Sequence, residues 1–331
     1  MRKILLLLAA CSLLFLLAPR EKDAEPLVTT AACALPALST ALWPPPAPKA
    51  PPKAAPLPPS AAAIVYLVDL ARPERVAELR ESLRALQRHF FAAAGRAAYP
   101  VLLFYEPAHA RWVAERGAGA AAPLAAPPRF VAVEGFYGGG AAASDGYRRM
   151  CRFWAMGVFR QPAVRALRYF WRLDTDLRLL RPIALDPFRL MEARALDYLF
   201  GAWSREAPEV VVGLWDALRA FAAARNLSTA GLAPYAAAFG AADGTAEGAA
   251  EGGGYNLRMV YNNFEVVRVA LWRDSAAYAA LCAEALEAGI RRRRWGDAPI
   301  RTLALALLFP DARVAQWRGL CYHHAAPQWT L

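Results

Sequence analysis

The feature that most constrains the fold of this chain is the stretch YFWRLDTDLRLLRPI at residues 169–183. Its first five residues are apolar apart from one arginine, which is typical of a buried strand. Two carboxylates, Asp174 and Asp176, follow at once with one residue between them. In open α/β sheets ligands bind beyond the carboxyl ends of the strands. The stretch therefore predicts a strand that delivers an acidic pair to a binding edge.

An acidic pair at the end of a strand has two interpretations. Carboxylate oxygens are the ligands that hard divalent cations prefer, and such a cation can hold a diphosphate. The alternative is structural, because aspartates also cap helices and begin turns. The preceding strand favours the metal site, with Asp174 as the first ligand and Asp176 as a direct or water-mediated one.

The rest of the chain alternates between strand-like and helix-like segments. Apolar runs predict further strands at residues 63–68, 101–105, 130–133, 261–269 and 314–317. Helices are expected at residues 73–90, 111–115, 147–159, 275–288 and 298–308. Strands that alternate with helices predict a doubly wound α/β sheet flanked by helices. The glycine-rich tract 240–254 reads as a loop or insertion.

The N-terminal part of the chain predicts an anchored layout. MRK is followed by an apolar run at residues 4–18, which fits a short signal anchor better than a cleaved signal peptide. Residues 21–60, rich in alanine and proline, are expected to form an extended stem. Residues 61–331 would then be a single lumenal domain of a type II membrane protein.

The net charge limits the classes of binding partner, and the cysteine content limits the possible disulfide bridges. The net charge of +11 does not indicate nucleic acid, since the arginines are dispersed and no nucleic-acid motif is present. Anionic nucleotide-sugars or membrane surfaces fit better. Of five cysteines, Cys151, Cys282 and Cys321 lie in the expected domain and allow at most one bridge among themselves. The sequon at Asn226 could be glycosylated if it is exposed.

Four blocks of the chain resemble the fungal-type α-1,2-mannosyltransferases of glycosyltransferase family 15. They are SDGYRRMCRFW (144–154), the stretch 169–183, YNNFE (261–265), and RWGDAP (294–299) running on to CYHH (321–324). Their order and spacing also match. Two departures stand out: the Glu-Pro-Asp of the family is Asp-Thr-Asp here, and its His-Pro near the C-terminus is His324-Ala325.

The resemblance implies a Golgi type II membrane enzyme with a GT-A-like fold. It implies a retaining transfer of mannose from GDP-mannose to a mannose-terminated glycan acceptor on glycoprotein or glycolipid, with Mn²⁺ as cofactor. Two alternatives remain: the same fold with another nucleotide-sugar donor, or a non-catalytic lumenal glycan-binding relative. A donor panel and substitutions of the acidic residues separate them.

The resemblance also implies roles for individual residues. Asp174 and His324 would bind the metal, with His323 as a competing ligand. Glu265 matches the candidate nucleophile, although a buried glutamate paired with Arg268 or Arg258 is the structural alternative. Asp297 would bind an acceptor hydroxyl; its place before Ala298-Pro299 independently favours a cap of the helix that follows. The residues implied to bind donor or substrate are Tyr147, Arg152, Arg172, Asp176, Arg294 and Trp295.

Overall fold

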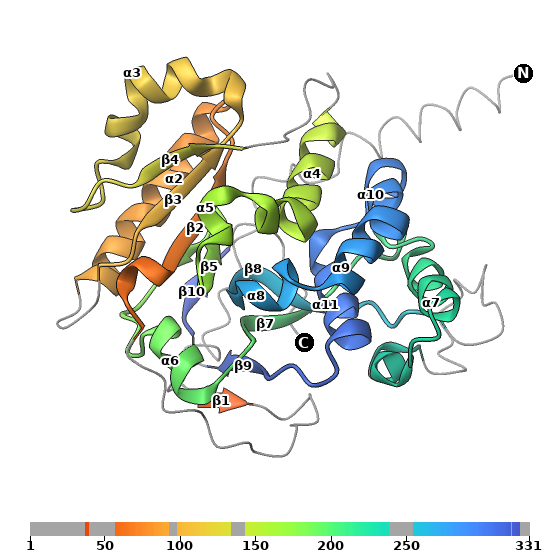
Figure 1. Ribbon diagram of the computed structural model, residues 1–331. Helices are drawn as coiled ribbons and strands as arrows, with labels where there is room; N and C mark the ends of the chain where they lie inside the picture. The colour runs from red at the N-terminus through yellow and green to blue at the C-terminus, as the bar shows by residue number, and fades with distance from the viewer. Residues whose placement is uncertain are drawn as a thin grey trace, which may run out of the picture.

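The structure of the protein is a computed structural model that describes residues 37–39, 57–92, 98–133, 143–237, 254–318 and 320–324. Its centre is one mixed sheet of eight strands in the order β1-β9-β7-β8-β5-β2-β3-β4 (Figure 1). The strands are β1 (Ala37–Ser39), β2 (Ala62–Val68), β3 (Val101–Tyr105), β4 (Arg129–Ala132), β5 (Tyr169–Leu173), β7 (Tyr198–Arg205), β8 (Arg258–Arg268) and β9 (Val314–Arg318).

The strand directions divide this sheet into two parts. Strand β2 runs parallel to both β3 and β5, and β3 runs parallel to β4. Strand β8 lies antiparallel between β5 and β7, and β9 runs parallel to β7. The parallel half arises because each of its strands is joined to the next by a helical crossover. Strand β8 therefore connects the two halves and lies directly beside β5.

One face of the sheet is covered by α2 (Pro73–Leu86) and α6 (Pro187–Arg194). The apolar side of α2 continues into a π-helical turn, η3 (Gln87–Phe91), and buries Leu79, Leu83 and Phe90. The short helices η2 (Pro59–Ala61) and η4 (Pro107–His109) lie at strand ends, and α3 (Ala110–Ala121) runs beside β4. This face forms one of two apolar cores.

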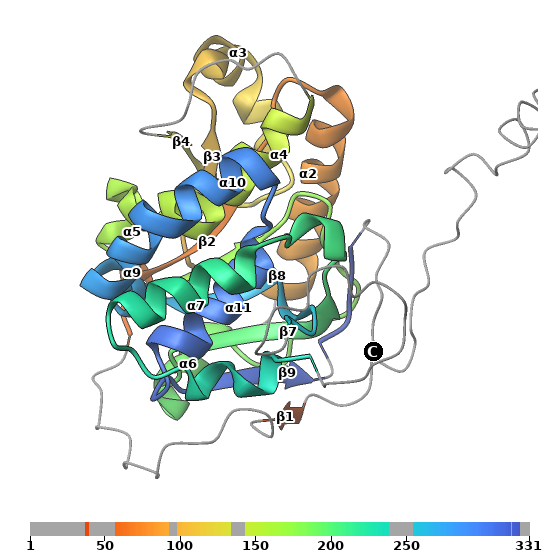
Figure 2. The same cartoon turned by 90° about the vertical axis from the view of Figure 1, so that its right-hand side faces the viewer.

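The other face carries the larger core and most of the helices (Figure 2). These are α4 (Ala143–Arg152), η5 (Phe153–Gly157), η6 (Val158–Arg160), α5 (Pro162–Arg165), η7 (Pro208–Val210), α7 (Leu214–Ala224), η8 (Ala230–Tyr235), α8 (Val269–Arg273), α9 (Ala276–Leu281), η9 (Cys282–Leu286), α10 (Glu287–Arg293) and α11 (Asp297–Leu308). Helix α11 is buried along almost its whole length and packs on β8. Both cores share the one sheet, so the described residues form a single domain.

A separate two-stranded sheet positions the C-terminal part of the described chain. Strands β6 (Arg178–Leu179) and β10 (Tyr322–His323) pair in antiparallel fashion, with His323 opposite Arg178. The backbone N–H of Leu180 also donates to the carbonyl of Cys321. Because β6 follows β5 after a short turn, this pairing brings residues 322–324 next to the acidic pair.

Most elements expected from the sequence are confirmed, with boundaries close to those predicted. The helix expected at residues 111–115 is longer than predicted, and the segment 275–288 continues through η9 into α10. Strand β7, helices α6 and α7, and the β6–β10 pair were not predicted. Strand β7 is an apolar run interrupted by Gly201, and because glycine weakens the interior of a strand, its sequence gives only a weak strand signal.

The expected anchor at residues 1–20 lies outside the described residues, as do most of the stem and of the tract 240–254. Within the stem, Ala37–Ser39 forms an edge strand antiparallel to β9, so this piece of the expected spacer belongs to the sheet. In the part of the chain that the structure describes, no helix has both the length and the apolar character to cross a membrane.

The cysteines of the domain do not bridge to one another. Cys151 and Cys282 are free and buried, whereas Cys321 takes part in a disulfide. Asn226 is exposed just after α7, in the left-handed conformation with φ of 52°. The exposure on which glycosylation of this sequon depends is therefore present.

Candidate active site

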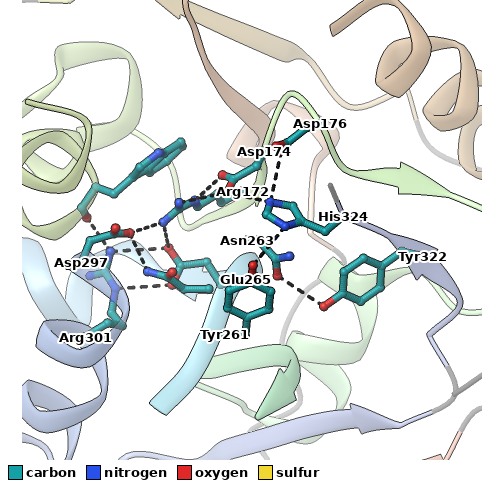
Figure 3. Close-up of polar contacts among 12 residues, drawn as sticks. Arg172, Asp174, Asp176, Tyr261, Asn263, Glu265, Asp297, Arg301, Tyr322 and His324 are labelled. Carbon is teal, nitrogen blue, oxygen red and sulfur yellow. Dashed lines mark hydrogen bonds and ion pairs between the residues drawn. The ribbon is translucent and has the colours of Figure 1, made fainter. Parts of the chain in front are cut away.

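Three metal-ligating side chains converge at the carboxyl end of β5. Asp174, Asp176 and His324 each offer one ligand atom, and these atoms all lie within 4.8 Å of one another. His324 Nε2 lies 3.1 Å from Asp176 Oδ1 and 3.6 Å from Asp174 Oδ2 (Figure 3). The predicted metal ligands are thus brought together by the fold.

The backbone and its neighbours hold this cluster in place. The N–H of Asp174 donates to the carbonyl of Asn263 on β8, and the carbonyl of Asp174 accepts from the N–H of Leu177 to close the turn. The other imidazole nitrogen, His324 Nδ1, lies 3.0 Å from the hydroxyl of Tyr261. A second contact that fixes the ring is what a metal-binding histidine requires.

Against the effect of burial, the two aspartates raise the pKa of the His324 imidazole. Burial alone would lower its pKa, but the hydrogen bonds and charges of Asp174 and Asp176 raise the pKa of His324 to about 9. The pKa of Asp176 is lowered; burial opposes this shift, which comes from His324 and the more distant Arg75. Two carboxylates and one neutral imidazole would carry a charge of −2, so a divalent cation in place of the proton would neutralise the cluster.

Two carboxylates and one imidazole offer both oxygen and nitrogen ligands. Such a mixed set suits a hard or borderline cation such as Mn²⁺. His323 does not compete for this place, because it pairs with Arg178 and lines a different side of the β6–β10 sheet. Of the two adjacent histidines, the fold selects His324.

Arg172 lies beside the metal cluster and is buried, at 2% exposure. Its Nε donates to Asp174 Oδ1 at 2.9 Å, and its Nη1 donates to Asp297 Oδ2 at 2.5 Å. The same Nη1 lies 4.0 Å from Glu265 Oε1, and the guanidinium stacks 4.2 Å above the ring of Trp154. One arginine therefore connects three carboxylates, one in the turn just after β5, one on β8 and one on α11.

Asp297 does not cap the helix that it begins. The N-cap residue of α11 is Gly296, without a side-chain capping bond, and Asp297 is the first helical residue. Its carboxylate instead accepts from Arg172 and, at 2.8 Å, from Nδ2 of Asn262. The capping interpretation is wrong, because a buried guanidinium offers a stronger, charge-assisted partner than the backbone N–H groups.

Glu265 is fully buried opposite Arg172 in the pairing of β5 with β8. Oε2 accepts from the hydroxyl of Tyr198 at 2.5 Å and lies 3.4 Å from Nε of Arg301. Burial raises the pKa of Glu265, and the charges of Arg301 and Arg172 oppose that shift. The expected partners Arg268 and Arg258 are replaced by Arg301 of α11.

Two of the residues expected to bind donor or substrate make structural contacts within the fold. The Nε of Arg152 donates to both carboxylate oxygens of Glu287 of α10, at 2.7 and 2.8 Å. Trp295 is buried at 4% exposure in the large core, and its Nε1 donates to the carbonyl of Val212. The structure therefore gives Trp295 a packing role.

Arg294 and Tyr147 lie together at the start of α11. The guanidinium of Arg294 stacks 4.2 Å above the ring of Tyr147. Burial, with smaller contributions from Cys151 and Asp297, raises the pKa of Tyr147 well above its usual range. A phenol that stays protonated can serve as a hydrogen-bond donor to an anion.

Four residues that build the site were not predicted from the sequence. Arg301, Tyr198, Asn262 and Trp154 complete the network around Arg172 and Glu265. A signal existed for Arg301, because an arginine within the apolar helix 300–308 must find a buried acidic partner. Tyr198 belongs to the strand that was not predicted and gave no such signal.

A comparison with known protein families agrees with this geometry. The family described as glycolipid 2-alpha-mannosyltransferase matches residues 140–329, which is more than half of the chain. The chain belongs to this family. The resemblance carried by the four sequence blocks is therefore confirmed.

Curated relatives match the same part of the chain. Glycolipid 2-alpha-mannosyltransferase 1 of Candida albicans is 31% identical over 184 residues, covering 55% of this chain and 40% of the relative. Alpha-1,2 mannosyltransferase KTR1 of Saccharomyces cerevisiae is 27% identical over 182 residues, covering 55% and 44%. The alignments thus span less than half the length of these relatives.

Solved structures show the same fold. Core-mannan synthase A (CmsA/Ktr4) from Aspergillus fumigatus, in a Mn/GDP form, aligns with a TM-score of 0.62 at 21% identity, over 81% of this chain and 75% of that one. Mannosyltransferase Ktr4p from S. cerevisiae, in complex with GDP, aligns with a TM-score of 0.63 at 20% identity, over 81% and 72%. The expected GT-A-like α/β fold is confirmed.

Proposed function

We propose that this protein is a retaining α-1,2-mannosyltransferase that transfers mannose from GDP-mannose to a mannose-terminated glycan on glycoprotein or glycolipid. The observation that carries the proposal is the convergence of Asp174, Asp176 and His324 at the end of β5. Family membership supports the sugar, and the GDP complexes of its structural neighbours support the nucleotide.

We propose Mn²⁺ as the cofactor, held by Asp174 and His324, with Asp176 as a further ligand or a partner of a ribose hydroxyl. The mixed carboxylate and imidazole set fits this ion. When bound, the cation would supply positive charge that offsets the charge developing on the departing diphosphate.

Arg172 would supply fixed positive charge next to the cation. Asp174 and Asp297 hold its guanidinium from two sides, and the ring of Trp154 covers one face. A charge that is already oriented needs no reorganisation as the leaving group forms. Tyr147, kept protonated, would donate a hydrogen bond to the donor.

Glu265 would be essential to this arrangement. In this structure its carboxylate is buried and engaged by Tyr198 and Arg301, so it acts first by fixing Arg172 and Arg301. The family resemblance implies that the residue at this sequence position faces the anomeric carbon of the donor sugar. The test is the transfer activity of Glu265→Gln, measured in protein that is still folded. A loss of activity in that protein reports the positioning role, because loss of the fold is then excluded as the cause.

We further propose a Golgi location with the domain in the lumen, anchored through the apolar run at residues 4–18. Two features of the domain support an oxidising secretory compartment: the disulfide at Cys321 and the exposed sequon at Asn226. Protection of the domain from protease in intact vesicles, with a sugar on Asn226, tests this placement.

The activity is tested by incubating the full chain with GDP-mannose, Mn²⁺ and a panel of mannosides. We expect GDP release and a product whose new linkage is α-1,2 by nuclear magnetic resonance. Chelation with EDTA should stop the reaction, and added Mn²⁺ should restore it. Asp174→Ala should abolish transfer, while Asp216→Ala on the distant helix α7 should not.

Three outcomes would contradict the proposal. Turnover of UDP-galactose or UDP-glucose in place of GDP-mannose would indicate another donor. Binding of glycans without turnover, unchanged in Asp174→Ala, would indicate a non-catalytic relative. A folded protein that binds GDP yet transfers no mannose to any mannoside of the panel would exclude the proposed mannosyltransferase activity.

A further inference from the structure

A cavity of about 360 Å³ lies between helix α2 with its η3 extension and the β6–β10 sheet. Its polar wall consists of Glu81, Arg84, Arg88, His89, Arg178 and His323. Its volume lies in the range of small-molecule sites. It does not include Asp174, Asp176 or His324, so it is separate from the candidate metal site.

The β6–β10 sheet separates the cavity from the metal cluster. His323 and Arg178 are directly opposite in the antiparallel register and both line the cavity. Successive side chains of an extended strand point to opposite faces. The next residue, His324, accordingly contacts Asp174 and Asp176 on the other side.

The cavity has an excess of positive charge. Three arginines and one glutamate line it, which gives a net charge of +2 with the histidines neutral. Glu81 forms an ion pair with Arg84. Among the described residues, Arg88 and Arg178 have no acidic partner within ion-pair distance. Two guanidinium groups are thus left to bind an anion.

The histidines add unsatisfied polar groups to this charge. Nη2 of Arg178 lies 3.4 Å from Nδ1 of His323. Because a guanidinium only donates, Nδ1 has to be the acceptor, which places the imidazole proton on Nε2. That Nε2 is buried and has no hydrogen-bond partner among the described residues, and the same holds for Nδ1 of His89.

A buried donor without an acceptor costs free energy, so a ligand that supplies acceptor oxygens would be stabilised at this wall. Guanidinium groups bind phosphate through two parallel hydrogen bonds, which favours phosphate among anions. The cavity exceeds the size of a phosphate ion, and Ala85 and the exposed Leu180 provide an apolar wall for a carbon skeleton.

We propose that this cavity binds the phosphate group of a small organic phosphate of about hexose-phosphate size. Arg88 and Arg178 hold the phosphate oxygens, and Nε2 of His323 donates to one of them. The carbon skeleton lies along the Ala85 and Leu180 wall. The proposal is independent of the proposed transferase activity, because none of the metal-cluster residues takes part.

The test is isothermal titration calorimetry on the full chain, in EDTA so that phosphate cannot bind through a cation. The probes are glucose 6-phosphate, inorganic phosphate and uncharged glucose. We expect one site for glucose 6-phosphate, weaker binding of inorganic phosphate, and none of glucose. Arg88→Ala and Arg178→Gln should each weaken binding by about tenfold or more.

Two control variants make the result specific. Arg80→Ala removes one positive charge from helix α2 at a residue that does not line the cavity, so the affinity of this variant should equal that of the unsubstituted protein. Asp174→Asn alters the metal cluster and should leave phosphate binding intact. Thermal unfolding of each variant confirms that it is folded before binding is compared.

Several results would overturn the proposal. The absence of saturable binding to the folded, unsubstituted protein would do so, as would equal affinity in Arg88→Ala, Arg178→Gln and Arg80→Ala. Loss of binding in Asp174→Asn would indicate that the phosphate binds at the metal cluster and not in the cavity. Binding of inorganic phosphate with no glucose 6-phosphate binding would refute the organic-phosphate assignment.

Discussion

His324 Nε2 lies 3.6 Å from Asp174 Oδ2, although one residue ends a central strand and the other follows the last described strand of the chain. The β6–β10 pairing creates this proximity, since β6 begins four residues after Asp174 and β10 ends one residue before His324. The candidate metal site therefore depends on a small two-stranded sheet as much as on its ligands.

The first prediction concerns the two neighbouring histidines. His324→Ala should weaken Mn²⁺ binding by at least about tenfold, because it removes one of three convergent ligands. His323→Ala is the matched control and should retain Mn²⁺ affinity, since its ring faces the cavity. Electron paramagnetic resonance of free Mn²⁺ measures both. Equal losses of Mn²⁺ affinity in the two variants would show that the affinity depends on the β6–β10 pairing and not on the His324 imidazole.

The second prediction concerns the buried ion network. Arg172→Met leaves the carboxylates of Asp174 and Asp297 without their guanidinium, and should lower the free energy of unfolding by about 3–5 kcal/mol. Urea denaturation measures this loss. The double variant Arg172→Met with Asp297→Asn should recover part of it, because one uncompensated charge is gone. Additive losses would argue against a direct pair.

The third prediction concerns Glu265. Glu265→Gln keeps the shape of the side chain but leaves Arg301 as an uncompensated buried charge, so we expect a loss of about 3 kcal/mol or more in unfolding free energy. Transfer should fall by at least about 100-fold in protein that is still folded. Glu115→Gln, which breaks the exposed contact with Arg111 on α3, should change neither quantity appreciably.

The fourth prediction concerns packing beneath Trp295. A Cβ atom on Gly289 would lie 2.0 Å from the Trp295 ring, so Gly289→Ala should destabilise the protein by about 1–3 kcal/mol or more. Gly119→Ala in α3 meets no atom within 4 Å and should stabilise by about 0.5–1 kcal/mol. Thermal unfolding distinguishes the two. A stable Gly289→Ala would contradict the buried position of Trp295.

The sequence determined the strand at 169–173, its terminal aspartates and the order of the matching blocks, because apolar runs and short motifs are local properties. It also predicted six strands of the main sheet and several of the helices around it, but not α6 or α7. It could not show which partners a buried charge would find. The local sequence suited Asp297 to cap a helix, yet its carboxylate pairs with Arg172 from another element.

Only the tertiary structure decided which side chains share a site. Pairing of β5 with β8 places Glu265 opposite Arg172, and packing of α11 on β8 adds Arg301. Trp295, which belongs to the matching string RWGDAP, lies in the core. The physical reason is that periodicity along the chain indicates which face of an element is buried, whereas contacts between distant elements depend on strand register and helix packing.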